Sequence, residues 1–581
     1  MDLFTLEIIE NGLIAAAEEM FVVWGRTAKS PVIYEVLDYG CGITDWRGEL
    51  IAIAAGIPTF LGTLDLATRE AIERHSPDGF EEGDIMISNI PYRSGTHLND
   101  VTLIMPVFAG GRLLAFTASK GHWSEIGGMH FGSWSPSSTE IYQEGLQFPA
   151  VKLFRAGRPN VDLIDVIRQN VRTPDLTLGD MEGQIASVRV GAAAIGRLVS
   201  RYGADAVREA MGLIWQRGRQ QALAALARMP RGTYVAEDWI DDDGITDDPL
   251  RVCVRVDLRP DGVTFDFTGS APQARGPINS PFGGTISTSR VILKALLNPH
   301  DPSTGGDFSV LTVVAPEGSI FNPKPPAPVA TNWEGRSYVG DLVWKALCQA
   351  LPDRLVAGNY NSVCATIVGG IDDRTGEPFA VVEPQPGGWG GGEGKDGESG
   401  MFYLGNGETY AMPVEVLEAR TPIRFERYAF DREAARGAGR FRGGLGIVKE
   451  YRITNSHATF TASFGRSKFP AWGAAGGEGG SPNYFVVEKP GEPPRRLSKI
   501  TALRLSGGDL IQMHTGTGGG FGDPLERDPE RVATDVQEGF VSAGRVQEVY
   551  GVALTGDGRV DGPATAAERA SLREKRRGGA R

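Results

Sequence analysis

Two histidines and one aspartate flank a short hydrophobic hairpin, and they are the residues of this chain best suited to chemistry. His97 and Asp100 lie in Gly-Thr-His-Leu-Asn-Asp (95–100), and His122 ends Lys-Gly-His (120–122). Imidazole and carboxylate groups bind Zn²⁺, Mn²⁺ or Fe²⁺, and three such ligands leave positions open for water and substrate. The pattern indicates a metal centre. The alternative is three unrelated polar residues near the base of a hairpin.

The segment between these residues explains how they can meet. Residues 101–108 and 112–118 read as two strands around a tight turn at Gly110-Gly111. If the turn centres on these glycines, opposing residue numbers sum to 110 + 111 = 221, and His122 faces Asn99 with His97 two residues further along the same face. Strict alternation points Asp100 the other way, so we expect residues 97–100 to form a turn, where positions i and i+3 share a face. Pro106 indicates an edge strand or a bulge.

Composition narrows the class of protein. The chain has 581 residues, enough for about four average domains. Its net charge of −13 argues against a general nucleic-acid binder, which needs a basic face. No apolar run reaches the roughly 20 residues of a membrane span, and the N-terminus has helical spacing instead of a signal peptide. The four cysteines form no CxxC pair and are expected to be core thiols in a reducing cytoplasm.

The expected organisation is α+β, mixed and multi-lobed. An N-terminal α/β lobe (1–175) carries the hairpin, and a helical hairpin (176–232) follows with a stop at Tyr202-Gly203. A β-rich mixed lobe with glycine-rich loops spans 233–525, with strands at 251–258 and 263–267 and helices at 285–297 and 340–351. A C-terminal extension covers 526–581, and the end of its charged tail is expected to fray.

Two glycine-rich loops, 387–396 and 515–524, resemble nucleotide loops only superficially. A phosphate-binding P-loop needs a glycine five positions before its Gly-Lys and a hydroxyl residue after it, but Trp389 and Asp396 stand there. The second loop has no Gly-Lys at all. We expect no ATP site in this chain. The loops indicate close backbone approach that only glycine permits, or contact of backbone N–H groups with an oxyanion.

The hairpin segment and the motifs around it resemble the hydantoinase B/oxoprolinase family. The matching motifs run in one order along nearly the whole chain: 38–39, 57–58 with 61–62, 89–92, 95–100, 106–108, 122–128, 144–146, 170–172, 179–180 with 184–186, 266–270, 442–446 and 518–524. The resemblance implies a hydantoinase B-like fold. It also implies one subunit of an ATP-dependent hydantoinase, 5-oxoprolinase, caprolactamase, or acetone or acetophenone carboxylase.

The resemblance further implies a partner and a division of labour. A hydantoinase A-type subunit would bind ATP and phosphorylate the substrate's carbonyl or enol oxygen, and this chain would complete the reaction at a divalent metal ion (Zn, Mn or Fe). The expected assembly is a hetero-oligomer such as α2β2. His97, Asp100 and His122 fall on the family's metal-ligand pattern. Asp100 is expected to orient or deprotonate water, and Glu144 and Asp180 are further catalytic candidates, with a helix cap or a loop tether as their alternative roles.

Two departures from the family pattern stand out. Where members often have His-His-x-Asp-x-Gly-Gly, this chain has Trp123 and Glu125 at the second and fourth positions. A ligand or acid role for position 123 is therefore excluded, whereas Glu125 keeps a carboxylate. Trp123 and Trp134 either form an apolar wall for a larger or flatter substrate or are buried in the core.

Three functions compete. The first is a metal-dependent subunit that hydrolyses a cyclic amide after the amide carbonyl has been phosphorylated. Phosphorylation makes the carbonyl carbon electrophilic, and a bound metal supplies hydroxide near neutral pH. The second is a subunit of an acetone- or acetophenone-type carboxylase, which would take a ketone. The third is a non-catalytic scaffold for the ATPase.

Overall fold

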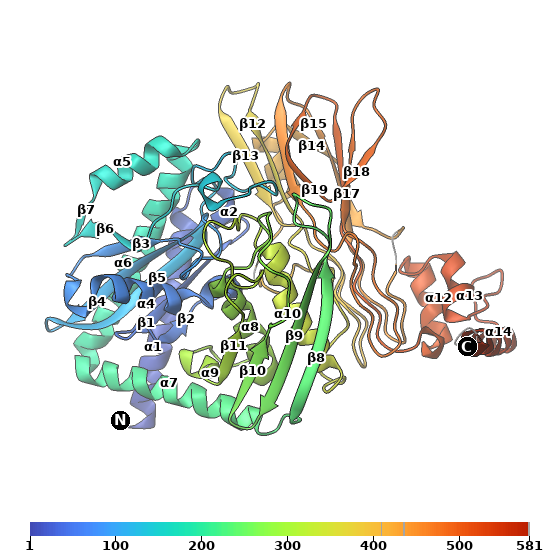
Figure 1. Ribbon diagram of the computed structural model, residues 1–581, viewed down its shortest axis with the longest axis horizontal. Helices are drawn as coiled ribbons and strands as arrows, with labels where there is room; N and C mark the ends of the chain where they lie inside the picture. The colour runs from blue at the N-terminus through green and yellow to red at the C-terminus, as the bar shows by residue number, and fades with distance from the viewer. Residues whose placement is uncertain (408, 434–435, 579–581) are drawn as a thin grey trace.

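The computed structural model describes residues 1–407, 409–433 and 436–578, and it is an α+β protein with several sheets, as expected (Figure 1). The N-terminal unit is built on an antiparallel seven-stranded sheet in the order β2-β1-β5-β4-β3-β6-β7. Its strands are β1 (Tyr39–Asp45), β2 (Leu50–Ile53), β3 (Ile85–Ser88), β4 (Asp100–Ala109), β5 (Arg112–His122), β6 (Val151–Arg155) and β7 (Arg158–Pro159).

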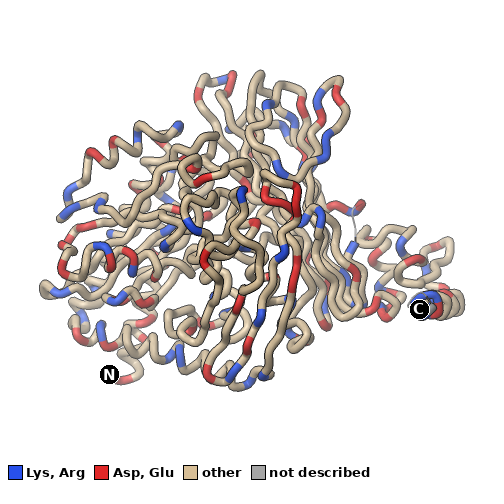
Figure 2. Tube along the Cα trace, in the orientation of Figure 1, with Lys and Arg blue, Asp and Glu red and all other residues tan. Residues whose placement is uncertain are grey.

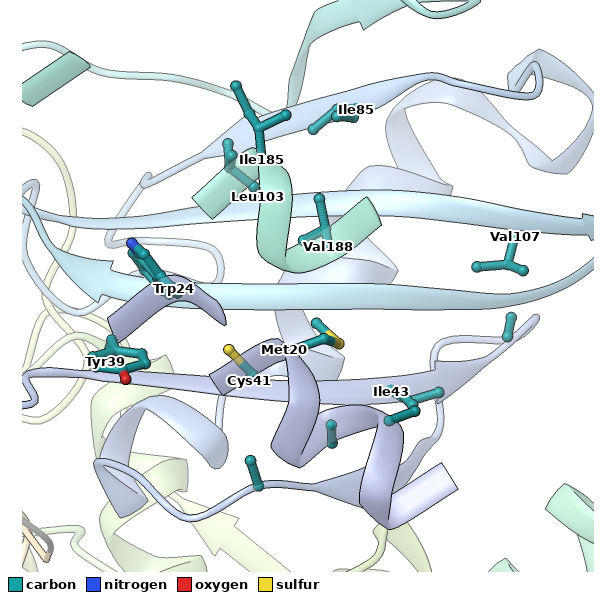
Figure 3. Packing of buried hydrophobic residues seen from close by; sticks show 14 of the residues in the cluster. Met20, Trp24, Tyr39, Cys41, Ile43, Ile85, Leu103, Val107, Ile185 and Val188 are labelled. Atoms are coloured by element: carbon teal, nitrogen blue, oxygen red, sulfur yellow. The ribbon is translucent and has the colours of Figure 1, made fainter. Parts of the chain in front are cut away.

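Long helices cover one face of this sheet, and Figure 3 shows their contact with it. Met20 and Trp24 of α1 (Leu3–Thr27) and Ile185 and Val188 of α6 (Pro174–Tyr202) pack with Leu103 of β4 in one buried cluster. The apolar residues recur at helical spacing, so each helix buries one stripe. The Asp2 side chain caps α1 by accepting the backbone N–H of Thr5 at 3.0 Å.

The predicted helical hairpin is present. α6 ends at Tyr202, and α7 (Ala204–Leu226) begins after Gly203. The backbone φ of Gly203 is 86°, a conformation that glycine adopts at little cost. The Gln184 side chain of α6 donates to the backbone oxygens of Val101 and Ser119, at 3.0 and 2.9 Å. The hairpin therefore braces β4 and β5.

The other face of the same sheet packs against α4 (Leu64–His75). Ile104 of β4 and Phe116 and Ala118 of β5 form a buried cluster with this helix. Short helices join the N-terminal elements: α2 (Pro31–Tyr34), α3 (Pro58–Leu61) and α5 (Val161–Asn170).

A second sheet, in the order β11-β10-β9-β8, packs against α8 (Phe282–Leu297) and α10 (Trp333–Cys348). The predicted hairpin is confirmed as β9 and β10, but α10 begins seven residues before the expected Gly340. Its first two turns are buried on every side, so they show no amphipathic stripe. The remaining elements are β8 (Gly232–Ile240), β9 (Leu250–Arg259), β10 (Gly262–Asp266), β11 (Leu311–Val314) and α9 (Gly305–Phe308).

Two further sheets enclose a third core. Phe460 of β16 meets Phe485 of β17 edge to face, with ring centroids 5.3 Å apart. The four-stranded sheet contains β12 (Ala365–Ile371), β13 (Pro378–Glu383), β16 (Ala458–Ser463) and β19 (Lys499–Leu505). The five-stranded sheet contains β14 (Ile423–Phe430), β15 (Ile447–Ile453), β17 (Tyr484–Glu488), β18 (Arg495–Leu497) and β20 (Leu510–His514), and α11 (Val414–Arg420) precedes β14.

Glycine-rich segments form a layer of their own, visible as the closely spaced irregular traces below this sandwich in Figure 1. A Cβ on Gly518 would collide with the Trp389 oxygen, and one on Gly390 with the Ala357 oxygen. The expectation of close backbone approach is therefore confirmed. Backbone hydrogen bonds join the segments: Gly388 to Gly516, Gly391 to Gly519, Gly518 to Gly444 and Gly519 to Gly358, at 2.9, 2.9, 3.1 and 2.8 Å.

The C-terminal helices α12 (Pro529–Glu538), α13 (Ala543–Tyr550) and α14 (Gly562–Gly578) project from the body (Figure 1). The expected fraying of the tail concerns residues 579–581, which lie outside the described residues. All four cysteines are free thiols, and three are buried. Basic and acidic residues are interspersed along the chain (Figure 2). In the described part of the chain, no helix has the length and apolar content needed to cross a bilayer.

Candidate metal centre

The hairpin forms with a different register from the one expected. His122 pairs with Asp100, not with Asn99, because a bulge lies between Val107 and Phe108 and shifts every pair beyond it by one residue. Pro106 stands next to the bulge, and β3 pairs with β4 only up to Ile104, so no ladder bond is lost at the proline.

The shifted register places Asp100 and His122 on one face of the sheet. They continue the cross-strand pair Ile104–Ala118, which faces α4, because side chains two residues apart share a face. The expected turn at 97–100 is present, with the backbone N–H of Asp100 donating to the His97 oxygen at 3.1 Å. Because of this turn, the His97 side chain lies next to the Asp100 carboxylate.

The three side chains form a compact buried group. His97 Nδ1 lies 2.6 Å from Asp100 Oδ2, and His122 Nδ1 lies 3.5 Å from Asp100 Oδ1. The imidazole centroids are 4.9 Å apart. One ligand atom from each residue lies within 4.8 Å of the others, and among described residues only this group of three or more His, Cys, Asp or Glu does so. Three ligand atoms this close together could be shared by one metal ion.

The charges suit metal binding. Burial alone raises the pKa of the Asp100 carboxyl, but interactions with His97 and with the nearby His122 imidazole outweigh burial and hold the pKa well below its usual value. Burial lowers the pKa of His97. Burial also acts to lower the pKa of His122, but the nearby carboxylates of Asp100 and Asp38 raise it. The group offers an ionised carboxylate and a neutral imidazole, while a proton on His122 competes with a metal.

Unpartnered atoms provide the test of fit. His97 Nε2, His122 Nε2 and Asp100 Oδ1 are all buried without a hydrogen bond. A buried polar atom without a partner costs about 1–3 kcal/mol, so three in one cluster indicate a missing ligand. Two imidazole nitrogens and a carboxylate oxygen are the donor set of a divalent transition metal, and these residues therefore fit one.

A small cavity of about 60 Å³ adjoins the three residues. Ligand pockets usually measure roughly 300–1,000 Å³, so admission of a ring-sized substrate requires that the walls move apart. The walls come from the N-terminal unit, from the start of α10 and from the four-stranded sheet of the third core. Besides the three candidate ligands, they are Asp38, Ile57, Phe60, Trp134, Asn332, Trp333, Arg336, Val363, Ala365, Val382, Glu383, Pro384 and Asn406.

Two charged wall residues lie outside the set chosen from the sequence. Burial raises the pKa of Asp38 to about 6, against the opposing charges of His122 and Arg336. Asp38 stands in a family motif, so its position in the sequence was a usable signal. Arg336 lies more than 200 residues from the hairpin along the chain. It belongs to the first turns of α10, which sequence periodicity did not predict, so nothing in the sequence pointed to it.

The structure brings neither Glu144 nor Asp180 to the cavity. Glu144 accepts the backbone N–H groups of Val329 and Ala330, each at 2.9 Å, and thereby ties its loop to the segment leading into α10. Asp180 accepts the N–H groups of Lys29 and Ser30, at 2.7 and 2.9 Å, where α1 passes into α2. Both side chains hold backbone segments in place.

Trp123 and Glu125 of the altered motif, and the nearby Trp134, have different surroundings. Trp123 is fully buried and donates to Gln184 Oε1 at 3.1 Å. Glu125 accepts from Arg172 Nη1 at 3.0 Å and from the Gly127 N–H at 2.9 Å, so it is tethered locally. Trp134 lines the cavity and meets Trp333 edge to face, with centroids 5.1 Å apart. Of the two tryptophans, only Trp134 forms part of an apolar wall.

Comparisons with known proteins agree with this architecture. The family model for hydantoinase B/oxoprolinase matches residues 2–524. The chain is 30% identical over 579 residues to a putative D-/L-hydantoinase subunit from Pseudomonas sp. (strain NS671), with 97% of each chain covered. It is also 30% identical over 587 residues to the beta subunit of the caprolactamase of Pseudomonas jessenii, covering 98% of this chain and 99% of that one.

Solved structures show the same fold. The crystal structure of the ATP-dependent caprolactamase from Pseudomonas jessenii superposes with a TM-score of 0.90 at 28% identity, covering 98% of this chain and all of that one. A nucleotide-free acetone carboxylase structure gives a TM-score of 0.92 at 22% identity, covering 99% and 83%. The resemblance seen in the motifs is confirmed, and this chain belongs to the hydantoinase B/oxoprolinase family.

Proposed function

We propose that this chain is the metal-dependent catalytic subunit of a two-component, ATP-dependent enzyme that opens a cyclic amide such as a hydantoin, 5-oxoproline or a lactam. The observation that carries the proposal is the buried group of His97, Asp100 and His122, each with an unpartnered ligand atom beside a cavity. The names of the relatives, a hydantoinase subunit and a caprolactamase subunit, support a cyclic amide as the substrate.

The proposed reaction begins on a partner subunit of the hydantoinase A type, which phosphorylates the amide oxygen with ATP. Addition of water to the activated carbon, departure of the protonated ring nitrogen and hydrolysis of the remaining acyl phosphate give the open product and inorganic phosphate. Both relatives are named as subunits of a larger enzyme, which supports a partner chain, and we propose a hetero-oligomer such as α2β2.

Named residues have distinct tasks in this proposal. His97, Asp100 and His122 would hold one Zn, Mn or Fe ion, which when bound supplies a Lewis acid and lowers the pKa of water to about 7. Asp100 also orients the attacking water or takes its proton, and Thr96 and His97 fix the carboxylate by hydrogen bonds. Trp134 and Trp333 exclude bulk water from one side of the cavity.

The decisive experiment is a substrate panel on the co-purified complex of this chain and its hydantoinase A-type partner. ATP consumption and product formation are measured with hydantoins, 5-oxoproline, lactams and ketones, and metal content is measured in the same preparation. We expect ring opening of one cyclic amide class, about one metal per chain, and no ATP hydrolysis by this chain alone.

Other outcomes discriminate between the alternatives. Carboxylation of a ketone would replace hydrolysis by the carboxylase function. Full turnover by a complex whose chain carries the His97→Ala and His122→Ala changes would reduce this chain to a scaffold. Tight ATP binding by the isolated chain would contradict the proposed division of labour.

A further inference from the structure

Arg336 is a buried arginine that has the neutral phenol of Tyr403 beside it but no carboxylate partner among the described residues. Its side chain lies in the first turns of α10, and the residue is 5% exposed. Among described residues, no carboxylate oxygen lies within 4.0 Å of its guanidinium, and its Nε is buried without a hydrogen bond. Arg290, by contrast, holds Asp65 with two bonds of 2.7 and 2.9 Å. Burial of an unpaired cation is costly, so Arg336 indicates a missing anion.

Asn332 adds a second, independent observation. It is 1% exposed, and both its amide nitrogen and its amide oxygen are buried without a partner. It occupies the N-cap position of α10, four residues before Arg336, so the two side chains share one face of the helix. Both residues line the cavity that contains His97, Asp100 and His122.

The charges around the cavity call for an anion once a metal is present. Asp38 and Asp100 contribute two negative charges. A divalent ion and Arg336 together would contribute three positive charges. The third wall carboxylate, Glu383, is already paired with Lys449 at 2.7 Å. The N-terminus of the 16-residue helix α10 adds a partial positive charge at the same place.

We infer that Arg336 and Asn332 form an oxyanion subsite beside the metal centre, which takes the phosphate group of the activated amide. The planar guanidinium matches the geometry of phosphate oxygens, and the Asn332 amide supplies a further N–H donor. The inference rests on the proposed function, since that function delivers a phosphorylated substrate to this cavity. A substrate carboxylate has the same oxyanion chemistry, and the test separates the two sources.

The test is a calorimetric titration of the metal-loaded, full-length chain with inorganic phosphate. Arg336→Gln should weaken phosphate binding about 10- to 100-fold, the usual effect of losing hydrogen bonds to a charged group. Metal content should not change, since Arg336 is not among the candidate ligands. Arg336→Lys should retain part of the affinity. Arg172→Gln is the matched control, because Arg172 pairs with Glu125 away from the cavity and its loss should leave phosphate binding as it is.

Asn332→Asp provides the second variant, needed in case Arg336→Gln alters folding or metal content. It changes size little but places a negative charge in the subsite, so phosphate binding should fall at least tenfold. Wild-type affinity for phosphate in both Arg336→Gln and Asn332→Asp would overturn the inference, as would a wild-type chain that binds no phosphate at millimolar concentration.

A parallel titration with acetate identifies the source of the oxyanion. Stronger Arg336-dependent binding of phosphate than of acetate supports the phosphate group of the activated substrate. The reverse preference assigns the subsite to a substrate carboxylate and overturns the phosphate assignment. These titrations use neither ATP nor the partner, so a complex that opens no cyclic amide would refute the proposed function without touching this result.

Discussion

Two buried polar regions of this protein each contain an arginine and two aspartates, but the arginine is paired with carboxylates in only one of them. Around Arg466, the charged groups are paired with one another, although Arg466 Nε and the Tyr338 hydroxyl make no hydrogen bond. The guanidinium binds Asp238 at 3.1 Å and also Asp341, and it lies 4.3 Å from the ring of Tyr338. Trp472 donates to Asp341 at 3.0 Å. We call the group of Arg466, Asp238, Asp341, Tyr338 and Trp472 the Arg466 cluster.

The cavity beside His97 differs in that Arg336 pairs with no carboxylate among the described residues and that one potential ligand atom each of His97, Asp100 and His122 makes no hydrogen bond. The Arg466 cluster joins β8, α10 and the loop after β16, and its charges satisfy one another. The residues with unpartnered atoms at the other region, His97, Asp100, His122, Asn332 and Arg336, line one common cavity. Buried polar groups that satisfy one another stabilise a fold, whereas buried groups left open are available to a ligand. Substitutions in the first region should therefore cost stability, and those in the second should cost activity.

The largest expected effect is on stability, in the Arg466 cluster. Arg466→Met leaves Asp341 buried without its cation and Asp238 with Lys345 alone, at 3.4 Å, and we expect a loss of about 3–5 kcal/mol in the free energy of unfolding. Arg336→Met removes a cation that pairs with no carboxylate and should cost much less. Denaturant unfolding of the two variants, monitored by far-UV circular dichroism, measures the difference. Equal losses would break the comparison between the regions.

The next effect is on metal binding. The His97→Ala, His122→Ala double variant should retain its fold but bind no metal, and product formation by the complex should fall at least about a thousandfold, or roughly 4 kcal/mol. Elemental analysis and product assays measure both. A chelator should lower the melting temperature of the wild type but not of the variant, because only a site that binds metal is stabilised by it. Full metal content in the variant would place the ion elsewhere.

A smaller effect is expected at Asp100, where one charge changes with little change in shape. Asp100→Asn weakens the hold on the metal and removes a base, so product should fall about a hundredfold, a loss of roughly 2.7 kcal/mol. Substrate-dependent ATP consumption should persist, because activation occurs on the partner. Parallel assays of ADP and ring-opened product test this. Equal losses of both would mean that the two steps are tightly gated, and unchanged product would remove Asp100 from the reaction.

The smallest effect on activity is expected at Asp180, whose Oδ1 accepts two backbone N–H groups away from the cavity while its Oδ2 makes no hydrogen bond. Asp180→Ala removes the acceptor for the Lys29 and Ser30 N–H groups and should cost about 1–3 kcal/mol of stability. Turnover at saturating substrate should stay within about twofold. Thermal melting and steady-state assays on one preparation test both statements, and a tenfold loss of turnover in a well-folded variant would return Asp180 to the catalytic residues.

Local pattern was sufficient for much of the fold. The α6–α7 pair, the β9–β10 hairpin and the hairpin of the candidate ligands all follow from periodicity and turn residues. The register of that hairpin did not, because the bulge at Val107 and Phe108 depends on the neighbouring strand and not on the turn alone. The three candidate ligands nevertheless lie close together, as predicted, because the turn at 97–100 brings His97 next to the ends of β4 and β5.

The far wall of the site was not predictable from sequence. Asn332 and Arg336 reach the cavity through tertiary packing of α10 against a different sheet, and their first turns carry no helical periodicity. Glu144 and Asp180 were chosen because they stand in family motifs, yet their oxygens accept backbone N–H groups. A motif marks a residue that the fold needs as readily as one that the reaction needs.

The glycine-rich layer has a consequence for the order of folding. Its hydrogen bonds join segments near residues 358, 388, 444 and 518, so no segment can complete its bonds before the others arrive. Glycine loses more conformational entropy on ordering than any other residue, and closure of such long loops adds to that cost. The layer should therefore form late and cooperatively, after the three apolar cores have brought its segments together, and slow acquisition of amide-exchange protection there would be the kinetic sign of it.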